Sequence, residues 1–121
     1  FYPHVSEMKP FKTYARIRKF TPAEAQVEDP RIFARAGGLK SDEVELGHDR
    51  AQKASFDAVL GPDASQRAVF QTCCQEAFDG AWSGSKVNIF CYGRSTSGKS
   101  HTVFGPEDRK PGVEDDWGIL Q

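Results

Sequence analysis

Apolar and polar residues alternate over short stretches in the first half of the chain. Alternation in residues 11–20 predicts a strand with mixed faces, with Arg16 and Arg18 on the same side. Residues 21–30 are polar and contain two prolines, so they are interpreted as a connector. Short alternating pieces around paired glycines predict a small antiparallel lobe at about residues 31–55.

The apolar spacing then changes to that of a helix, which is predicted over about residues 63–79. Asp63 is the expected N-cap, with Gln66 as its capping-box partner three residues later, and Gly80 is the expected stop. The apolar stripe of this helix consists of Ala68, Val69, Cys73 and Ala77, with Phe70 and Cys74 beside it.

A continuous apolar run, "VNIFCY", occupies residues 87–92. Its β-branched and aromatic residues are typical of a strand that is buried on both faces in a parallel sheet. A glycine-rich loop follows, and the short helix after it is expected to stop at Gly105-Pro106. The predicted order is therefore helix, loop, strand, glycine-rich loop and short helix.

Residues 93–100, "GRSTSGKS", match the phosphate-loop pattern G-x-x-x-x-G-K-[ST] in full. The two glycines permit a sharp turn and a close approach to phosphate, and the loop N–H groups at a helix start favour an anion. Lys99 adds a point charge for the β and γ phosphates, and the Ser100 hydroxyl is placed to ligate Mg²⁺. The predicted phosphate contacts are Gly93, Arg94, Ser95, Thr96, Ser97, Gly98, Lys99 and Ser100.

Phosphoryl transfer also needs an acidic residue at the end of a second buried strand. No apolar run of that kind ends in Asp, and the acidic residues 114–116 resemble a solvated loop. The sequence therefore identifies a phosphate cradle but no catalytic residue.

The composition limits the classes of binding partner that the sequence predicts. The formal net charge is -1, which gives no electrostatic reason to expect nucleic acid or an anionic membrane. No apolar run approaches the roughly 18 residues of a membrane span. Cys73, Cys74 and Cys91 lack metal-ligand spacing and are interpreted as partly buried thiols of a cytosolic protein.

Three stretches together resemble the kinesin motor domain. "ARIRKF" is similar to its first strand, which carries an Arg-x-Arg-Pro motif, and "FDAVLGPDASQRAVFQ" to its strand, connector and helix start. "VNIFCYGRSTSGKSHTVFGP" is similar to its phosphate loop, after which the family helix is interrupted by a glycine. The closing "WGILQ" resembles the segment that opens the next helix.

The resemblance implies an ATP or ADP site with Mg²⁺ on Ser100. It places Arg16 near the adenine or ribose and His101 against the adenine face. Three positions depart from the family pattern: Lys19 stands in place of proline, Arg94 in place of glutamine and Ser100 in place of the commoner threonine.

The resemblance also implies the fold class: an α/β P-loop NTPase with a kinesin-like parallel or mixed sheet flanked by helices. Residues 1–121 correspond to the N-terminal third of the family domain, and its switch motifs are absent. Residues 87–92 would then have two unpaired edges. We therefore expect either a complementary C-terminal part of the motor domain or self-association.

The function expected from this resemblance is that of an ATP-dependent microtubule motor in the cytoplasm and on the cytoskeleton. The full-length protein would be a microtubule-stimulated ATPase, and the isolated 121 residues would be inactive. Two alternatives remain: another P-loop NTPase of kinase or GTPase type, or a non-catalytic domain with a vestigial phosphate loop that binds tubulin or another partner.

Overall fold

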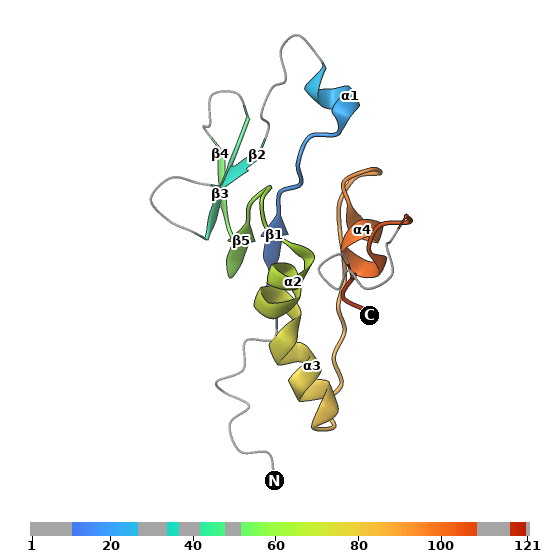
Figure 1. Cartoon of the computed structure of the whole chain (residues 1–121). Helices are drawn as coiled ribbons and strands as arrows, with labels where there is room; N and C mark the ends of the chain where they lie inside the picture. Colours follow the sequence, from blue (N-terminus) through green and yellow to red (C-terminus); the bar gives the residue numbers. More distant parts are fainter. Residues whose placement is uncertain (1–10, 27–33, 37–41, 48–51, 109–116, 121) are drawn as a thin grey trace.

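The computed structural model of the protein describes residues 11–26, 34–36, 42–47, 52–108 and 117–120 (Figure 1). These residues form a two-stranded parallel sheet, a three-stranded antiparallel sheet and several helices, which gives mixed α/β content. No helix among them is both long and apolar enough to cross a membrane.

The parallel sheet joins β1 (Tyr14–Arg16) to β5 (Ala58–Leu60). The Ile17 N–H extends the pairing by donating to the Leu60 carbonyl at 2.9 Å. The strand predicted within residues 11–20 is confirmed, but only for three residues.

The antiparallel sheet has the order β2-β3-β4, formed by β2 (Ala34–Ala36), β3 (Glu43–Leu46) and β4 (Gln52–Ser55). It lies within residues 31–55, the range in which the alternating pattern predicts an antiparallel lobe. Val44 on β3 is buried, with 4% of its surface exposed.

Residues 66–82 form one continuous helical segment (Figure 1). It comprises α2 (Gln66–Val69), a π-helical turn η1 (Phe70–Cys74) and α3 (Gln75–Trp82). Its buried apolar residues are Val69, on the apolar stripe predicted from the sequence, and Cys74, beside that stripe. Together with Val44, Leu60 and Ile119 they form the buried apolar core of the described residues.

Both ends of this helical segment differ from the sequence prediction. The N-cap is Ser65, whose hydroxyl accepts from the Ala68 N–H at 3.1 Å. Asp63 is exposed and does not cap the helix. The Ala64 N–H donates to the Gly61 carbonyl at 3.1 Å and closes a turn, so the helix begins after this turn.

Gly80 does not stop the helix, since it has helical backbone geometry and α3 continues to Trp82. The change of direction occurs at Gly84, which has a φ of 97°. Glycine is favoured at such a left-handed position after a helix.

Residues 21–26 are not an irregular connector. They contain the single-turn helix α1 (Pro22–Ala25), with Thr21 as its N-cap. Thr21 and Glu24 form a capping box, in which each side chain bonds the backbone N–H of the other residue. The sequence carries this signature as Thr-Pro-Ala-Glu, with proline at the favoured first position of the helix.

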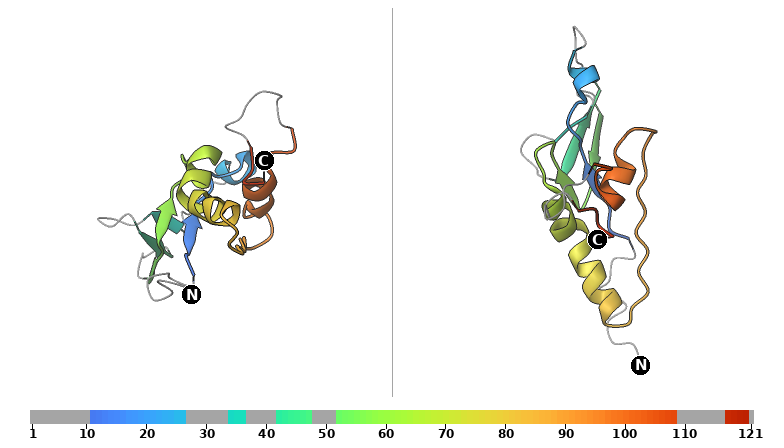
Figure 2. Two further views of the ribbon diagram at one scale, coloured as in Figure 1. Left: turned by 90° about the horizontal axis from the view of Figure 1, so that it is seen from below. Right: turned by 45° about the vertical axis from the view of Figure 1, so that its right-hand side comes forward.

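The prediction that residues 87–92 form a buried strand is wrong for this structure. The segment pairs with no strand among the described residues, and it runs as an unpaired trace from α3 to the glycine-rich loop (Figures 1 and 2). Phe90 and Tyr92 are 86% and 103% exposed, and Cys91 is also exposed. An apolar strand is buried only when neighbouring elements cover it, and the described residues provide no such neighbour.

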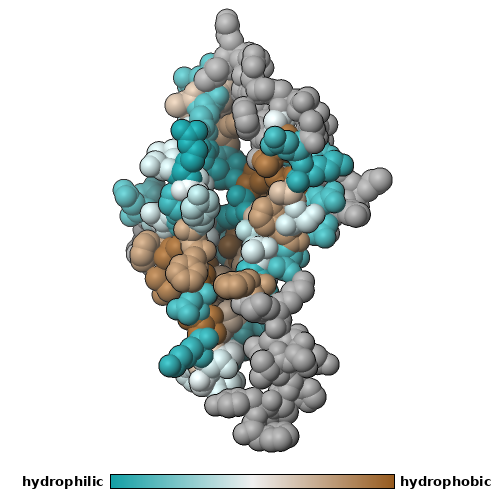
Figure 3. Space-filling view, turned by 180° about the vertical axis from the view of Figure 1, so that it is seen from behind, coloured by the Kyte–Doolittle hydropathy of each residue, from teal (hydrophilic) through white to brown (hydrophobic). Residues whose placement is uncertain are grey.

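Large apolar side chains are also exposed outside residues 87–92. Hydrophobic side chains reach the surface in several places on the face drawn in Figure 3. The large apolar residues that are exposed include Phe11, Phe20, Trp82, Phe104, Trp117 and Leu120. Contiguous apolar surface on a protein usually marks a site that another surface covers.

Candidate phosphate-binding site

The phosphate loop (residues 93–100) is a tight turn that runs directly into α4 (Lys99–Phe104). The Ser97 N–H donates to the Arg94 carbonyl at 3.1 Å. Gly98 is the N-cap of α4 and has a φ of 101°. Residues that carry a Cβ rarely adopt this value, so glycine is favoured here. Thr96 has a φ of 64°, which is uncommon for a residue other than glycine.

The ammonium group of Lys99 lies against the start of its own loop. Its Nζ donates to the Gly93 carbonyl at 2.6 Å and to the Arg94 carbonyl at 2.7 Å. These two bonds close the turn, and an ammonium group has a third N–H to offer. The arrangement gathers the positive charge of Lys99 and the glycine positions of the motif in one place.

The early end of α4, which the sequence predicts at Gly105-Pro106, is confirmed. Gly105 follows the last helical residue with a φ of 79°, and its N–H donates to the His101 carbonyl at 2.9 Å. The last carbonyls of a helix have no intrahelical partner. Two of them accept from the closing segment of the chain: Ile119 donates to Thr102 at 3.0 Å and Leu120 to Val103 at 3.2 Å.

A half-buried polar network fixes α4 against β1 and α2. The Arg16 guanidinium donates from Nη1 to Gln66 Oε1 and, at 2.8 Å, to Thr102 Oγ1. Gln66 is buried, and its Nε2 donates to the His101 carbonyl at 2.6 Å. Burial lowers the pKa of Arg16 below its usual value.

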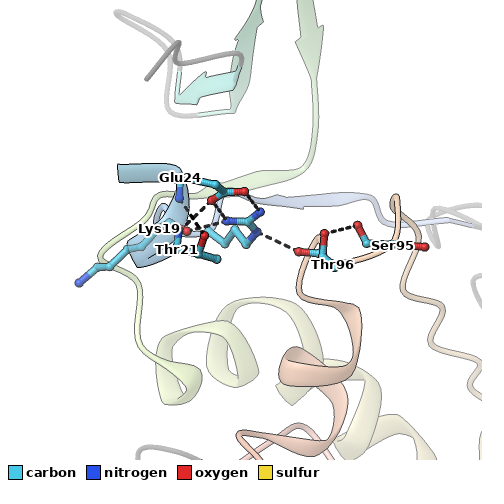
Figure 4. Close-up of polar contacts among 6 residues, drawn as sticks. Lys19, Thr21, Glu24, Ser95 and Thr96 are labelled. Carbon is cyan, nitrogen blue, oxygen red and sulfur yellow. Dashed lines mark hydrogen bonds and ion pairs between the residues drawn. The ribbon is translucent and has the colours of Figure 1, made fainter. Parts of the chain in front are cut away.

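A second arginine, Arg18, connects α1 to the phosphate loop (Figure 4). Nη1 and Nη2 donate to the two carboxylate oxygens of Glu24, both at 2.7 Å. Nε donates to the Thr96 carbonyl at 3.1 Å, and Nη1 also donates to the Lys19 carbonyl at 2.9 Å. Bidentate arginine–carboxylate pairs of this kind have a defined geometry as well as charge.

This pair has a predictable pH dependence. The hydrogen bonds from Arg18, and then that from Thr21, lower the pKa of Glu24 from its usual 4.5 to about 2. Because the folded pKa is the lower one, the pair stabilises the fold above pH 4.5 and is lost as the pH falls toward 2. We expect thermal stability to fall more with acidification in the wild type than in Glu24→Gln. Equal pH dependence of the two melting curves between pH 5 and pH 2 would contradict this.

The structure brings some of the predicted site residues together and leaves others at the surface. The phosphate loop and Lys99 form one compact unit. The side chains of Arg94, Ser100 and His101 are exposed. Arg16 directs Nη1 to Gln66 and Thr102, as described above.

Four residues that position the site were not identified from the sequence in this role. Gln66 was assigned to a helix cap, although it bonds Arg16 and the His101 carbonyl. Thr102, Arg18 and Glu24 received no role in the site. The capping-box pattern at Thr21 and Glu24 could have predicted α1 from the sequence. No local pattern could have predicted the contact between Arg18 and Thr96, because the two residues lie far apart in the chain.

The other groups considered among the described residues are metal ligands and thiols. No group of three or more His, Cys, Asp or Glu side chains among them is arranged to hold a metal ion. Burial raises the pKa of the Cys73 thiol to about 11 and also raises that of Cys74. These two thiols are partly or fully buried, as predicted, whereas Cys91 is exposed.

Comparisons with known proteins identify the family of the chain. Residues 16–117 match the family described as the kinesin motor domain. Kinesin-like protein KIN-14M of Oryza sativa subsp. japonica is 34% identical over 118 residues, which covers 95% of this chain and 10% of the relative. Kinesin-like protein KIF7 of Homo sapiens is 32% identical over 115 residues, which covers 95% of this chain and 8% of the relative.

A third relative matches a shorter stretch more closely. Kinesin-like protein KIN-7C, mitochondrial, of Arabidopsis thaliana is 41% identical over 71 residues, or 54% of this chain and 8% of the relative. The chain thus spans about a tenth of the length of the curated relatives that it matches. Since the family match extends over most of the sequence and includes the whole phosphate loop, the chain belongs to the kinesin motor domain family.

Proposed function

We propose that this chain supplies the nucleotide-phosphate cradle of an ATP-dependent microtubule motor, within a P-loop NTPase fold. The observation that carries the proposal is the phosphate loop itself. Its turn, its left-handed Gly98 and the inward-lying Lys99 ammonium occur together in a chain of the kinesin motor domain family.

The residues of the loop suit a nucleotide phosphate. A Cβ on Gly93 would lie 2.5 Å from Ser97 Oγ, so the glycine allows the two ends of the loop to lie close together without displacing the Ser97 side chain. Lys99 would contact the β and γ phosphates, and the Ser100 hydroxyl would hold Mg²⁺. When bound, Mg²⁺ neutralises charge on the phosphate oxygens.

The base and sugar would lie beside the same elements. We assign His101, exposed on α4, to the adenine face, and Arg16 to the neighbourhood of the adenine or ribose. Arg94 would add positive charge at the loop mouth, where its side chain is exposed. Arg16 would act from a fixed position, because Gln66 and Thr102 hold its Nη1.

The chain would contribute to ATP hydrolysis only as part of a longer protein. Two of its carboxylates have other partners: Glu24 bonds Arg18, and Glu76 pairs with Lys12. The sequence also offers no acidic residue at the end of a second buried strand. We therefore propose that the isolated chain is inactive. The full-length protein would be a microtubule-stimulated ATPase located on the cytoskeleton.

Steady-state ATP hydrolysis by the full-length protein, measured with and without microtubules, tests this function. We expect turnover that rises with microtubule concentration. Nucleotide binding without stimulated turnover would instead favour a non-catalytic tubulin-binding domain. Turnover that depends on a phosphate acceptor and ignores microtubules would favour a P-loop enzyme of kinase type.

The unpaired residues 87–92 support a further part of the proposal, namely that another polypeptide surface covers them. That surface would be a complementary part of the motor domain or a second copy of the chain. Exposed backbone and exposed apolar side chains such as Phe90 favour both arrangements.

The isolated 121-residue chain is therefore expected to self-associate. Multi-angle light scattering should give a mass above that of one 13.4 kDa chain, rising with protein concentration. The substitution Phe90→Lys should shift the distribution toward monomer, because it places charge on the exposed apolar segment. A monodisperse wild-type monomer would contradict the expectation.

A further inference from the structure

We propose that Arg18 and Glu24 form a positioning pair that holds the phosphate loop at Thr96 and thereby sets its affinity for nucleotide. This inference rests on the nucleotide binding proposed above. Both residues lie outside the phosphate-loop motif: Arg18 follows β1, and Glu24 is on α1.

The pair joins two separate parts of the chain through one guanidinium group (Figure 4). Both oxygens of Glu24 accept from Arg18 at 2.7 Å, and the Nε edge of the same group reaches the Thr96 carbonyl at 3.1 Å. The stem of Arg18 also passes beside Gly98, since a Cβ built there would lie 3.8 Å from Arg18 Cδ. Arg18 thus follows the loop from its middle to the N-cap of α4.

The loop has a local reason to need such support. Thr96 has a φ of 64°, a conformation that the surrounding structure must hold for a residue that is not glycine. Its hydroxyl bonds to the adjacent Ser95 carbonyl, at 2.6 Å, which does not fix the loop to another element. The Arg18 contact ties the Thr96 backbone to a segment that is distant in sequence.

Glu24 holds Arg18 in place rather than touching the loop. Its carboxylate is itself fixed, because Oε2 accepts from the Thr21 N–H at 2.8 Å in the capping box of α1. The guanidinium is a rigid, planar donor, so fixing its Nη1 and Nη2 also fixes the direction of Nε. A lysine at residue 18 has a single ammonium group and cannot reproduce this geometry.

The test uses the full-length protein with Arg18→Ala, Arg18→Lys and Glu24→Gln. Amide hydrogen exchange of residues 94–98 is measured without nucleotide, and Mg·ADP affinity is measured separately. We expect faster exchange at Ser97 and binding weaker by about tenfold for both Arg18 variants, since a hydrogen bond from a charged group is lost. Lys12→Ala, which removes an ion pair to Glu76 away from the loop, is the matched control and should change neither quantity.

A double-mutant cycle separates positioning from general destabilisation. If Glu24 acts through Arg18, Glu24→Gln should weaken Mg·ADP binding in the wild type but have no further effect in Arg18→Ala. Unchanged exchange at residues 94–98 in Arg18→Ala would overturn the proposal, as would additive effects in the cycle. If the wild type does not bind Mg·ADP, the proposed function fails, while the exchange data still decide whether the pair holds the loop.

Discussion

Replacing Lys99 with alanine is expected to weaken Mg·ADP binding by the full-length protein by about 100-fold or more. The ammonium lies 2.6 Å and 2.7 Å from two carbonyls of its own loop, so its removal takes away the positive charge that the proposed site offers to a phosphate. A charge-assisted hydrogen bond contributes about 1.5–3 kcal/mol, and the third N–H of Lys99 is available to donate one to a phosphate. Isothermal titration with Mg·ADP measures the change directly.

The matched control is Lys53→Ala. Lys53 is an exposed lysine on β4, in the antiparallel sheet, and its loss changes the net charge by the same amount. Its Mg·ADP affinity should equal that of the wild type. If Lys99→Ala and Lys53→Ala bind Mg·ADP equally well, the phosphate loop is not the nucleotide site and the proposed function fails.

Replacing Gly118 with alanine is expected to lower the free energy of unfolding by about 1–3 kcal/mol or more, because the added methyl group overpacks the structure. A Cβ at this position would lie 2.5 Å from backbone atoms of Phe104 and Gly105, and closer still to the Val103 carbonyl. Backbone at the end of a helix cannot rotate away as a side chain can. The closing segment would have to move, and its two hydrogen bonds to Thr102 and Val103 would be lost.

Urea denaturation gives the size of the Gly118→Ala effect, and amide exchange across residues 99–105 locates it. Gly61→Ala is the control, since a Cβ there would meet nothing within 4 Å. That substitution should be neutral or slightly stabilising, because it reduces the freedom of the unfolded chain. Equal stability of Gly118→Ala and Gly61→Ala would show that the closing segment does not pack tightly on α4.

The Arg18 and Gly118 variants would test whether contacts from other elements hold the phosphate loop and α4 in place. The phosphate loop is held at its middle by Arg18 and at the far end of α4 by the closing segment. Between them, Arg16 and Gln66 fix the first turns of α4. The positions of Lys99, Ser100 and His101 thus depend on contacts from β1, α1, α2 and the closing segment.

Several of these features could be predicted from local sequence. The phosphate loop depends on a short run of residues whose spacing carries its own chemistry, and the end of α4 at Gly105 follows from the backbone freedom of glycine. The apolar stripe of residues 66–82 predicted which side of the helix is buried, because helical periodicity is a local property. The helix ends were less predictable, since Asp63 and Ser65 both suit an N-cap, and the turn at Gly61 decided between them.

The sequence by itself determined the family, the phosphate loop with Lys99 and Ser100, and the short helix that follows it. Only the tertiary structure decided that Gln66 bonds Arg16, that Arg18 holds Thr96, and that residues 87–92 lie unpaired. The physical reason is the range of the interactions. Turn and helix signals act over a few residues, whereas a hydrogen bond between distant segments, or the burial of a strand, depends on which other surfaces the fold brings alongside.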